Sequence, residues 1–193
     1  MKKTVLYDAH VALDAKMVDF AGFMMPISYT SITEEHNYVR EKAGLFDVSH
    51  MGEFYVKGKE AEQFVDYIFT NDVTVMEKGQ VLYGMMLYPS GGVVDDLLVY
   101  KVKNDFFIMV VNASNIDKDF EWAASQNKFD CILTNQSDLV AEIAIQGPLA
   151  EKILQPLTDF NLSELQFFTF ANMKILWKKV VVSRTGYTGE DGF

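Results

Sequence analysis

The chain has 193 residues, of which 49% are hydrophobic and 13% aromatic, and its formal net charge is −10. This length suits one large domain or two small ones with a real core, and the apolar share is typical of globular proteins. An acidic chain without a basic run argues against nucleic acid as a partner, and the absence of a long apolar stretch argues against a membrane span. The single Cys131 rules out an internal disulfide and is typical of a reducing compartment. The first residues lack the apolar core of a signal peptide, so we expect a cytoplasmic protein.

The first fifty residues combine an apolar segment with one helix. Residues 16–26 are apolar but interrupted by Gly22 and Pro26, which favours an irregular or strand-like backbone. Ser31 and Glu34 form a capping-box pattern and Gly44 supplies a stop, so a helix is predicted between them, over residues 32–43. In the segment LFDVSHMG that follows, the polar side chains are expected mainly to hydrogen-bond the local turn.

The middle of the chain has an α+β rhythm, because period-two alternation and helical spacing of apolar residues follow one another. Strands are expected at residues 53–56, 81–88, 93–102, 106–111 and 131–134, and helices at residues 59–69 and 116–126. This order of elements is a split βαβ arrangement, which predicts a ferredoxin-like layer.

The last third begins a second α+β layer, which hints at an internal duplication. Strands are expected at residues 140–145, 167–170 and 175–183, and a helix at residues 149–157, which Pro148 would begin. The final segment RTGYTGEDGF contains three glycines that demand unusual backbone angles or close approach of another chain segment. We interpret its end as a cut inside a motif.

Two adjacent carboxylates, Asp95 and Asp96, interrupt the apolar strand that follows a Gly-Gly turn. Neighbouring side chains of a strand point to opposite faces, so only one of the two can share a face with Val94 and Leu98. An ionised carboxylate among apolar neighbours is costly unless partners compensate. Two interpretations remain open here. Either the carboxylates cap turn amides or stay hydrated, or one of them is held at the mouth of a cavity to meet a ligand nitrogen.

Most standard chemistries are excluded by the sequence. The histidines lack metal-ligand spacing, and there is no P-loop, dinucleotide-binding glycine pattern or nucleophile elbow. Cys131 has no evident base and is interpreted as a core residue. Tyr83, Asn112 and Tyr187 each have a structural explanation as a packed ring or a helix cap. Together with one carboxylate they would form a pocket that offers aromatic faces and an amide to a flat heterocycle.

Six segments, in order and spread over nearly the whole chain, resemble the N-terminal half of the aminomethyltransferase (T-protein) family of the glycine cleavage system. They are residues 17–26 (MVDFAGFMMP), 44–52 (GLFDVSHMG), 91–97 (GGVVDDL), 110–113 (VVNA), 146–148 (QGP) and 184–190 (RTGYTGE). The demethylating domains of sarcosine and dimethylglycine oxidases and an iron–sulfur assembly factor share this folate-binding fold. The aspartate and the complete DVSHM segment favour the transferase.

The resemblance implies an activity and a set of site residues. The methylene of an aminomethyl group, carried on the lipoyl arm of the H-protein, would pass to tetrahydrofolate with release of ammonia. Asp96 matches the essential carboxylate of the family, and no metal is implied. Phe167 or Phe168 falls where the family often places tyrosines, so a hydroxyl contact would be lost there. The folate-contacting positions implied are Met51, Tyr83, Asp96, Asn112, Phe168 and Tyr187.

The resemblance also implies a domain plan within an α+β, folate-binding aminomethyltransferase-type fold. Residues 1–52 and 136–193 would form a first, incomplete folate-binding subdomain, residues 53–135 a ferredoxin-like subdomain, and the C-terminal β-barrel domain would be absent. In the family, a Glu that holds the pterin edge follows the Gly-Phe at residues 192–193. We therefore expect the 193 residues alone to be catalytically silent and prone to self-association. The alternative is a non-catalytic folate-binding or regulatory module, or a domain related to folate-dependent demethylases.

Overall fold

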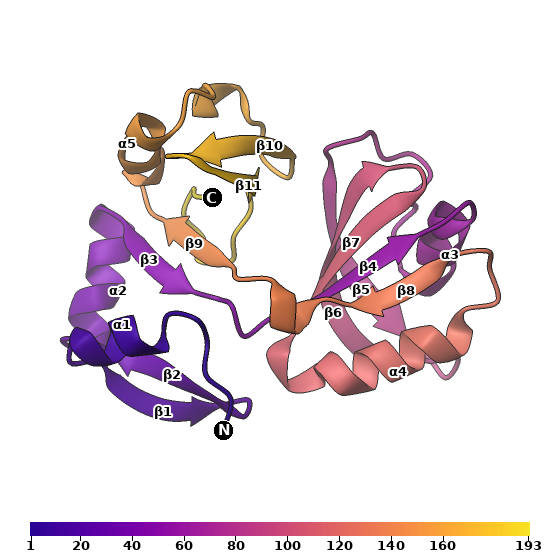
Figure 1. The fold of residues 1–193 in the computed structure, drawn as a ribbon, viewed down its shortest axis with the longest axis horizontal. Helices are drawn as coiled ribbons and strands as arrows, with labels where there is room; N and C mark the ends of the chain where they lie inside the picture. Colours follow the sequence, from indigo (N-terminus) through magenta and orange to yellow (C-terminus); the bar gives the residue numbers. More distant parts are fainter. The chain divides into compact units, whose positions relative to one another are not determined.

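The structure is a computed structural model that describes residues 1–193, which divide into two compact units (Figure 1). The first unit contains residues 1–50 and 141–193, and the second contains residues 51–140. No helix of either unit is both long enough and apolar enough to cross a lipid bilayer.

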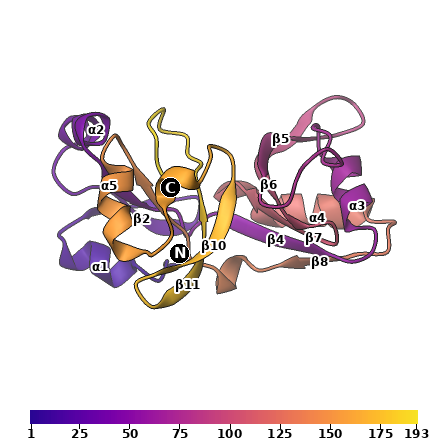
Figure 2. The same cartoon turned by 90° about the horizontal axis from the view of Figure 1, so that it is seen from above.

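The second unit is a five-stranded antiparallel sheet with two helices (Figures 1 and 2). Its spatial order is β5-β6-β7-β4-β8, so β4 and β6 run parallel with β7 between them. This is the split βαβ order of a ferredoxin-like layer, with β5 added at one edge. The elements are β4 (Gly52–Lys57), α3 (Ala61–Ile68), β5 (Val81–Leu87), β6 (Val93–Lys103), β7 (Phe106–Val111), α4 (Ile116–Gln126) and β8 (Ile132–Asn135). Every element predicted in this part of the chain is present, and the α+β class is confirmed.

The core of the second unit lies between the sheet and its two helices. Phe54, Phe107 and Met109 of the sheet are fully buried, and so is Phe64 of α3. The period-two pattern of the strands and the helical spacing of α3 place these side chains on facing surfaces. Burial of each large apolar side chain stabilises the fold by roughly 1.5–3 kcal/mol.

Within this unit no helix packs on the opposite face of the sheet. On β5 the side chains of Tyr83 and Met85 point to this open face and are 50% and 38% exposed. The register pairs Met85 with Asp96 of β6, which is partly exposed. The neighbouring Asp95 points to the helix-covered face and is only 5% exposed. The alternation of the strand therefore separates the two carboxylates into different environments.

The first unit contains three two-stranded antiparallel sheets with short helices. The β3–β9 pair joins the first and last thirds of the chain. The elements are α1 (Tyr7–Ala12), β1 (Lys16–Phe20), β2 (Phe23–Ser28), α2 (Ile32–Glu41), β3 (Gly44–Asp47), β9 (Ile143–Gln146), α5 (Ala150–Leu154), β10 (Phe170–Ile175) and β11 (Lys178–Ser183). The apolar segment at residues 16–26 becomes the β1–β2 hairpin, and α1 is a helix that the sequence did not predict. The capping prediction for α2 is confirmed, since Oγ of Ser31 accepts a hydrogen bond from the backbone N of Glu34.

Three predicted boundaries in this unit are wrong. The strand at residues 167–170 is a turn instead, with Phe168 at a left-handed φ of 58°, and β10 begins only at Phe170. The long strand at residues 175–183 starts at Lys178, because Leu176, also left-handed, turns the chain from β10 into β11. Gly44 begins β3 and does not end α2. An apolar run in the sequence does not show where a residue with left-handed backbone reverses the chain. The pattern therefore could not predict the turns at Phe168 and Leu176.

Candidate functional site

Asp95 is the cap of the turn that follows β7. Its Oδ1 accepts hydrogen bonds from the side-chain Nδ2 of Asn112 at 3.0 Å and of Asn115 at 2.8 Å, and its Oδ2 accepts one from the backbone N of Asn112 at 3.1 Å. Burial acts to raise the pKa of Asp95, but hydrogen bonds from Asp119, Asn112 and Asn115 together hold that pKa below its usual value. The first of the two sequence interpretations, a carboxylate that caps turn amides, describes this residue.

Asp96 lies on the open face of the sheet with two hydrogen-bond partners. The Tyr83 hydroxyl donates to its Oδ2 at 3.0 Å, and Nδ2 of Asn112 donates to its Oδ1 at 3.1 Å. Hydrogen bonding to Asp96 raises the pKa of Tyr83. Each oxygen of Asp96 accepts one of these bonds and keeps a further lone pair. Asp96 is therefore held in place and still able to accept a proton or a hydrogen bond from a ligand.

Four of the six predicted site residues belong to the second unit. Tyr83, Asp96 and Asn112 are joined by the hydrogen bonds just described. Met51 directly precedes β4, whose first residue Gly52 pairs with Val111, the residue before Asn112. Met51 and Asn112 therefore lie at the same end of the two neighbouring strands.

The remaining two, Phe168 and Tyr187, belong to the first unit. Tyr187 is 84% exposed in the loop that follows β11. The backbone N of Phe168 donates to the carbonyl O of Arg184 at 2.9 Å, and the ring of Phe168 packs edge-on against Phe167 with centroids 4.7 Å apart. The structure thus places both residues on backbone segments that are hydrogen-bonded to each other.

Gln146 organises the glycine-rich loop that carries Tyr187, and the residue pattern alone did not single it out. It is 1% exposed, its Nε2 donates to the carbonyl O of Thr185 at 3.2 Å, and its Oε1 accepts from Oγ1 of Thr188 at 2.9 Å. A Cβ atom added to Gly186 would overlap the Gln146 amide. Close approach, not an unusual φ, therefore explains this glycine. The signal available in the sequence was the QGP segment, which lies far from the loop along the chain.

Two arginines fasten the same loop. Arg184 donates from Nε to Oδ1 of Asp191 at 2.9 Å and also pairs with Glu151 at 3.0 Å. The Arg184 hydrogen bonds hold the pKa of Asp191 below its usual value. Arg40 of α2 donates to the carbonyl O of Thr188 and pairs with a loop glutamate. The loop is thus tied down on both sides of Tyr187.

Asp47 lies in a second polar cluster, and the prediction of mainly local turn bonding for it is wrong. One local bond is present, from the backbone N of Ser49 to Oδ1 at 3.0 Å. Its Oδ2 also accepts from Oγ1 of Thr4 at 2.6 Å and lies 2.9 Å from Nε2 of His10, whose Nδ1 lies 2.7 Å from the Tyr29 hydroxyl. The cluster ties α1 and the residue that follows β2 to β3, a long-range role that only the fold reveals.

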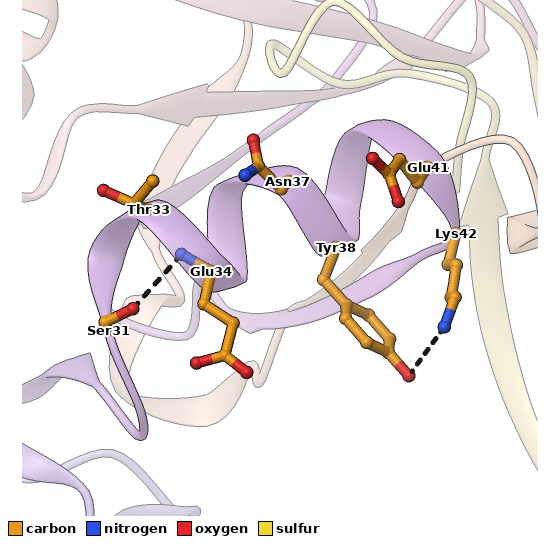
Figure 3. Close-up of a pocket in the computed structure, with 7 residues that line it drawn as sticks. All are labelled: Ser31, Thr33, Glu34, Asn37, Tyr38, Glu41 and Lys42. Atoms are coloured by element: carbon orange, nitrogen blue, oxygen red, sulfur yellow. Dashed lines mark hydrogen bonds between the residues drawn. The ribbon is translucent and has the colours of Figure 1, made fainter.

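An open depression runs along the exposed face of α2 (Figure 3). Its lining consists of Ser31, Thr33, Glu34, Asn37, Tyr38, Glu41 and Lys42. The helix buries none of its side chains, and within the depression the hydrogen bonds drawn are the Ser31 cap and a 3.5 Å contact from Lys42 Nζ to the Tyr38 hydroxyl. An exposed helix face without a buried polar group has none of the features of a catalytic site.

The buried acid Asp119 is expected to make the stability of the fold depend on pH. Burial and the hydrogen bond to Asp95 raise the pKa of Asp119 to about 7, whereas the unfolded chain releases this proton near the ordinary value of 3.8. The stabilisation from the bound proton is complete below the unfolded pKa and is lost as pH rises through the folded pKa. We expect the free energy of unfolding to fall between about pH 5 and about pH 8, and Asp119→Asn to remove this residue's share, on the order of 2 kcal/mol.

Urea unfolding at about pH 5 and at about pH 8 measures this change in the free energy of unfolding. Burial also raises the pKa of Glu142 in the first unit to about 7, so Glu142→Gln is the matched control that removes the other contribution in the same window. An unchanged pH slope in Asp119→Asn would contradict the prediction.

Comparison with known proteins supplies relatives for this geometry. The chain matches the family described as the GCVT N-terminal domain over residues 6–193. It is 53% identical over 196 residues to an aminomethyltransferase of Alkaliphilus oremlandii and 52% identical over 194 residues to one of Thermotoga maritima, covering 100% of this chain and 53% of each relative. The chain thus spans about half the length of the curated relatives it matches.

Two solved structures are similar to this chain in fold. The crystal structure of glycine cleavage system aminomethyltransferase T from Bartonella henselae matches with a TM-score of 0.91 at 33% identity, over 99% of this chain and 52% of that one. A heterotetrameric sarcosine oxidase from Corynebacterium sp. U-96 matches with a TM-score of 0.58 at 11% identity, over 83% of this chain and 80% of that one. The second likeness concerns the fold alone.

Proposed function

The chain belongs to the GCVT N-terminal domain family, and from this premise we propose that it is the folate-binding part of a cytoplasmic glycine cleavage aminomethyltransferase. The proposed reaction moves the methylene of an aminomethyl group from the lipoyl arm of the H-protein to tetrahydrofolate and releases ammonia. The chain spans about half of its curated relatives, so the activity of the whole enzyme is a proposal for these residues.

The observation that carries this proposal is the Asp96 carboxylate on the open face of the sheet. It is oriented by Tyr83 and Asn112 and keeps lone pairs that neither of them uses. Beside it, Met85 is half-buried and Tyr83 is half-exposed, which together offer apolar and aromatic contact to a planar ring. A carboxylate acceptor among apolar surfaces fits the N–H groups and the flat shape of a pterin.

Each residue then has a defined task in the proposed reaction. Tetrahydrofolate supplies the nucleophilic nitrogens that accept the methylene. Asp96 would accept a hydrogen bond from these nitrogens, orient them, and hold a proton during transfer. Asn112 and Tyr83 keep the carboxylate from turning away. Met51, Phe168 and Tyr187 are proposed as further folate contacts.

The proposal is tested on the 193-residue chain by titrating tetrahydrofolate in a calorimeter and by assaying ammonia release from aminomethyl-lipoyl H-protein. We expect weak binding and no turnover. Each pterin donor left unpaired should lower the affinity roughly ten- to a hundredfold below that of a full-length relative.

Each other outcome of these two assays is informative. Full turnover by a monodisperse 193-residue monomer would overturn the expectation that this chain is silent. Absence of any folate binding, even after the remaining half of a relative is added, would overturn the proposed function. Binding that is never accompanied by transfer would favour the binding-module alternative.

A separate prediction concerns the H-protein as partner. The chain has a net charge of −10, and we expect the lipoylated partner to be acidic as well. The two proteins would therefore repel each other unless a local basic patch offsets the repulsion. We therefore expect association to weaken as salt concentration rises, which surface plasmon resonance measures. A complex whose dissociation constant does not depend on salt would contradict electrostatic docking.

A further inference from the structure

We propose that Asp119 is a positioning residue for Asp96, because a single proton held between Asp119 and Asp95 fixes the Asn112 amide that donates to Asp96. The inference deepens the proposed function, since it takes Asp96 as the carboxylate that meets the folate. Asp119 itself lies on α4, away from the open face, and acts only through Asp95 and Asn112.

The first step is the environment of Asp119. Its side chain is completely buried against the sheet, which is unusual for an acid on a helix. If it were ionised, no hydrogen bond of good geometry would reach either of its oxygens. Nζ of Lys118 lies 3.0 Å from Oδ1, but the same ammonium group also donates to the carbonyl O of Val94. An ionised Asp119 would thus be poorly satisfied.

The second step is the position of the proton. Asp119 is completely buried and neither of its oxygens has a hydrogen-bond partner, so its ionised form is disfavoured. The neighbouring Asp95 carboxylate also raises the pKa of Asp119, so the pair retains a proton. Asp95 already accepts hydrogen bonds from Asn112 and Asn115 on both of its oxygens. A proton on Asp119 completes this arrangement, because Asp119 becomes the donor and Asp95 remains a pure acceptor.

The third step links the pair to the open face. Nδ2 of Asn112 lies 3.0 Å from Oδ1 of Asp95, 3.1 Å from Oδ1 of Asp96 and 3.1 Å from the carbonyl O of Asp96. Two amide hydrogens thus serve three acceptors, and the orientation of the amide depends on how strongly each acceptor attracts it. An ionised, fully hydrogen-bonded Asp95 anchors the amide on the buried side and leaves it aimed at Asp96.

The charged groups that face Asp119 are few. Asp95 faces it from β6, and Lys118 is its neighbour on α4. Beyond them, Asp96 and the Tyr83 hydroxyl lie on the far side of Asn112. Loss of the shared proton therefore places two negative charges next to each other, with one lysine to offset them. The Asn112 amide is the adjustable group between that pair and Asp96.

The test follows the Asn112 side-chain amide and the Asp96 carboxyl by NMR in the isotopically labelled 193-residue chain during a pH titration. We expect both signals to shift together in a step near the pKa of Asp119, about 7. Asp119→Asn keeps a donor toward Asp95 and removes the titrating group. It should abolish the step and preserve a slowly exchanging Asn112 amide at every pH, as a rescue by the conservative variant.

Asp119→Leu removes the donor as well as the charge. Exchange of the Asn112 amide hydrogens with solvent should then become at least ~10-fold faster, because their anchor is loosened. If Asp119→Leu does not fold, the Asp119→Asn titration alone decides the matter. A step near neutral pH that persists in Asp119→Asn, or an Asn112 amide unchanged in Asp119→Leu, would overturn the proposal.

A calorimetric arm separates this inference from the proposed function. Tetrahydrofolate affinity of the wild-type chain should decrease from about pH 6 to about pH 8, and that of Asp119→Asn should not. If no variant binds tetrahydrofolate while the NMR step behaves as expected, the coupling of Asp119 to Asp96 stands and only the folate assignment fails.

Discussion

Asp96→Asn is expected to lower the rate of methylene transfer by at least ~10²-fold while leaving tetrahydrofolate affinity within about tenfold. The amide keeps the size of the carboxylate and can still accept a hydrogen bond from Tyr83, but it cannot hold a proton. The measurement compares ammonia release with calorimetric affinity in a chimera that joins this chain to the remaining half of the Thermotoga maritima relative.

Asp95→Asn is the matched control for this experiment. Asp95 faces donors from Asn112 and Asn115, so a new amide NH₂ group there would meet other NH₂ groups. We expect a loss of stability of about 1–3 kcal/mol and a milder loss of transfer rate than in Asp96→Asn. An equal loss of binding and rate in Asp96→Asn would reduce Asp96 to a binding contact. A larger rate loss in Asp95→Asn than in Asp96→Asn would show that Asp95, and not Asp96, is the essential carboxylate.

Gly186→Ala is expected to have the largest effect on stability, about 3 kcal/mol or more. The added methyl group would overlap the Gln146 side chain, and Gln146 cannot move without breaking its bonds to Thr185 and Thr188. The loop that carries Tyr187 should therefore leave its place, which thermal or urea unfolding and limited proteolysis of the loop would detect.

Gly92→Ala is the control for the glycine prediction. A Cβ atom at Gly92 would have no neighbour nearer than 3.8 Å, so its effect on stability should stay within about 0.5 kcal/mol. A Gly186→Ala protein as stable as Gly92→Ala would show that the loop has room that the packing around Gln146 does not suggest.

Local patterns in the sequence were sufficient for most of the second unit. The alternation in β4 and the helical spacing in α3 rest on neighbours within a few positions, and the structure has these elements where the pattern puts them. The N-terminal cap of α2 in the first unit was local in the same way. Such signals survive because each element buries the apolar face that its own period creates.

The glycine-rich loop and the polar clusters were decided by contacts between distant parts of the chain. Gln146 is 39 residues from Thr185, and His10 is 37 residues from Asp47. A local pattern carries no information about which distant group will satisfy a buried amide or carboxylate. The turns at Phe168 and Leu176 were missed for a related reason, since apolar residues at positive φ are held there only by the surrounding fold.

The pair Asp95 and Asp96 shows both what the sequence determines and what it leaves to the tertiary structure. The sequence by itself determined that Asp95 and Asp96 must point to opposite faces of one strand, because the side-chain period of a strand is two residues. Which face carries a helix, and therefore which carboxylate is buried with Asp119 and which stays open beside Tyr83, was decided only by the tertiary structure. Burial is a property of what packs against a strand, and the core that covers β6 includes residues of α3 and α4, outside the strand itself.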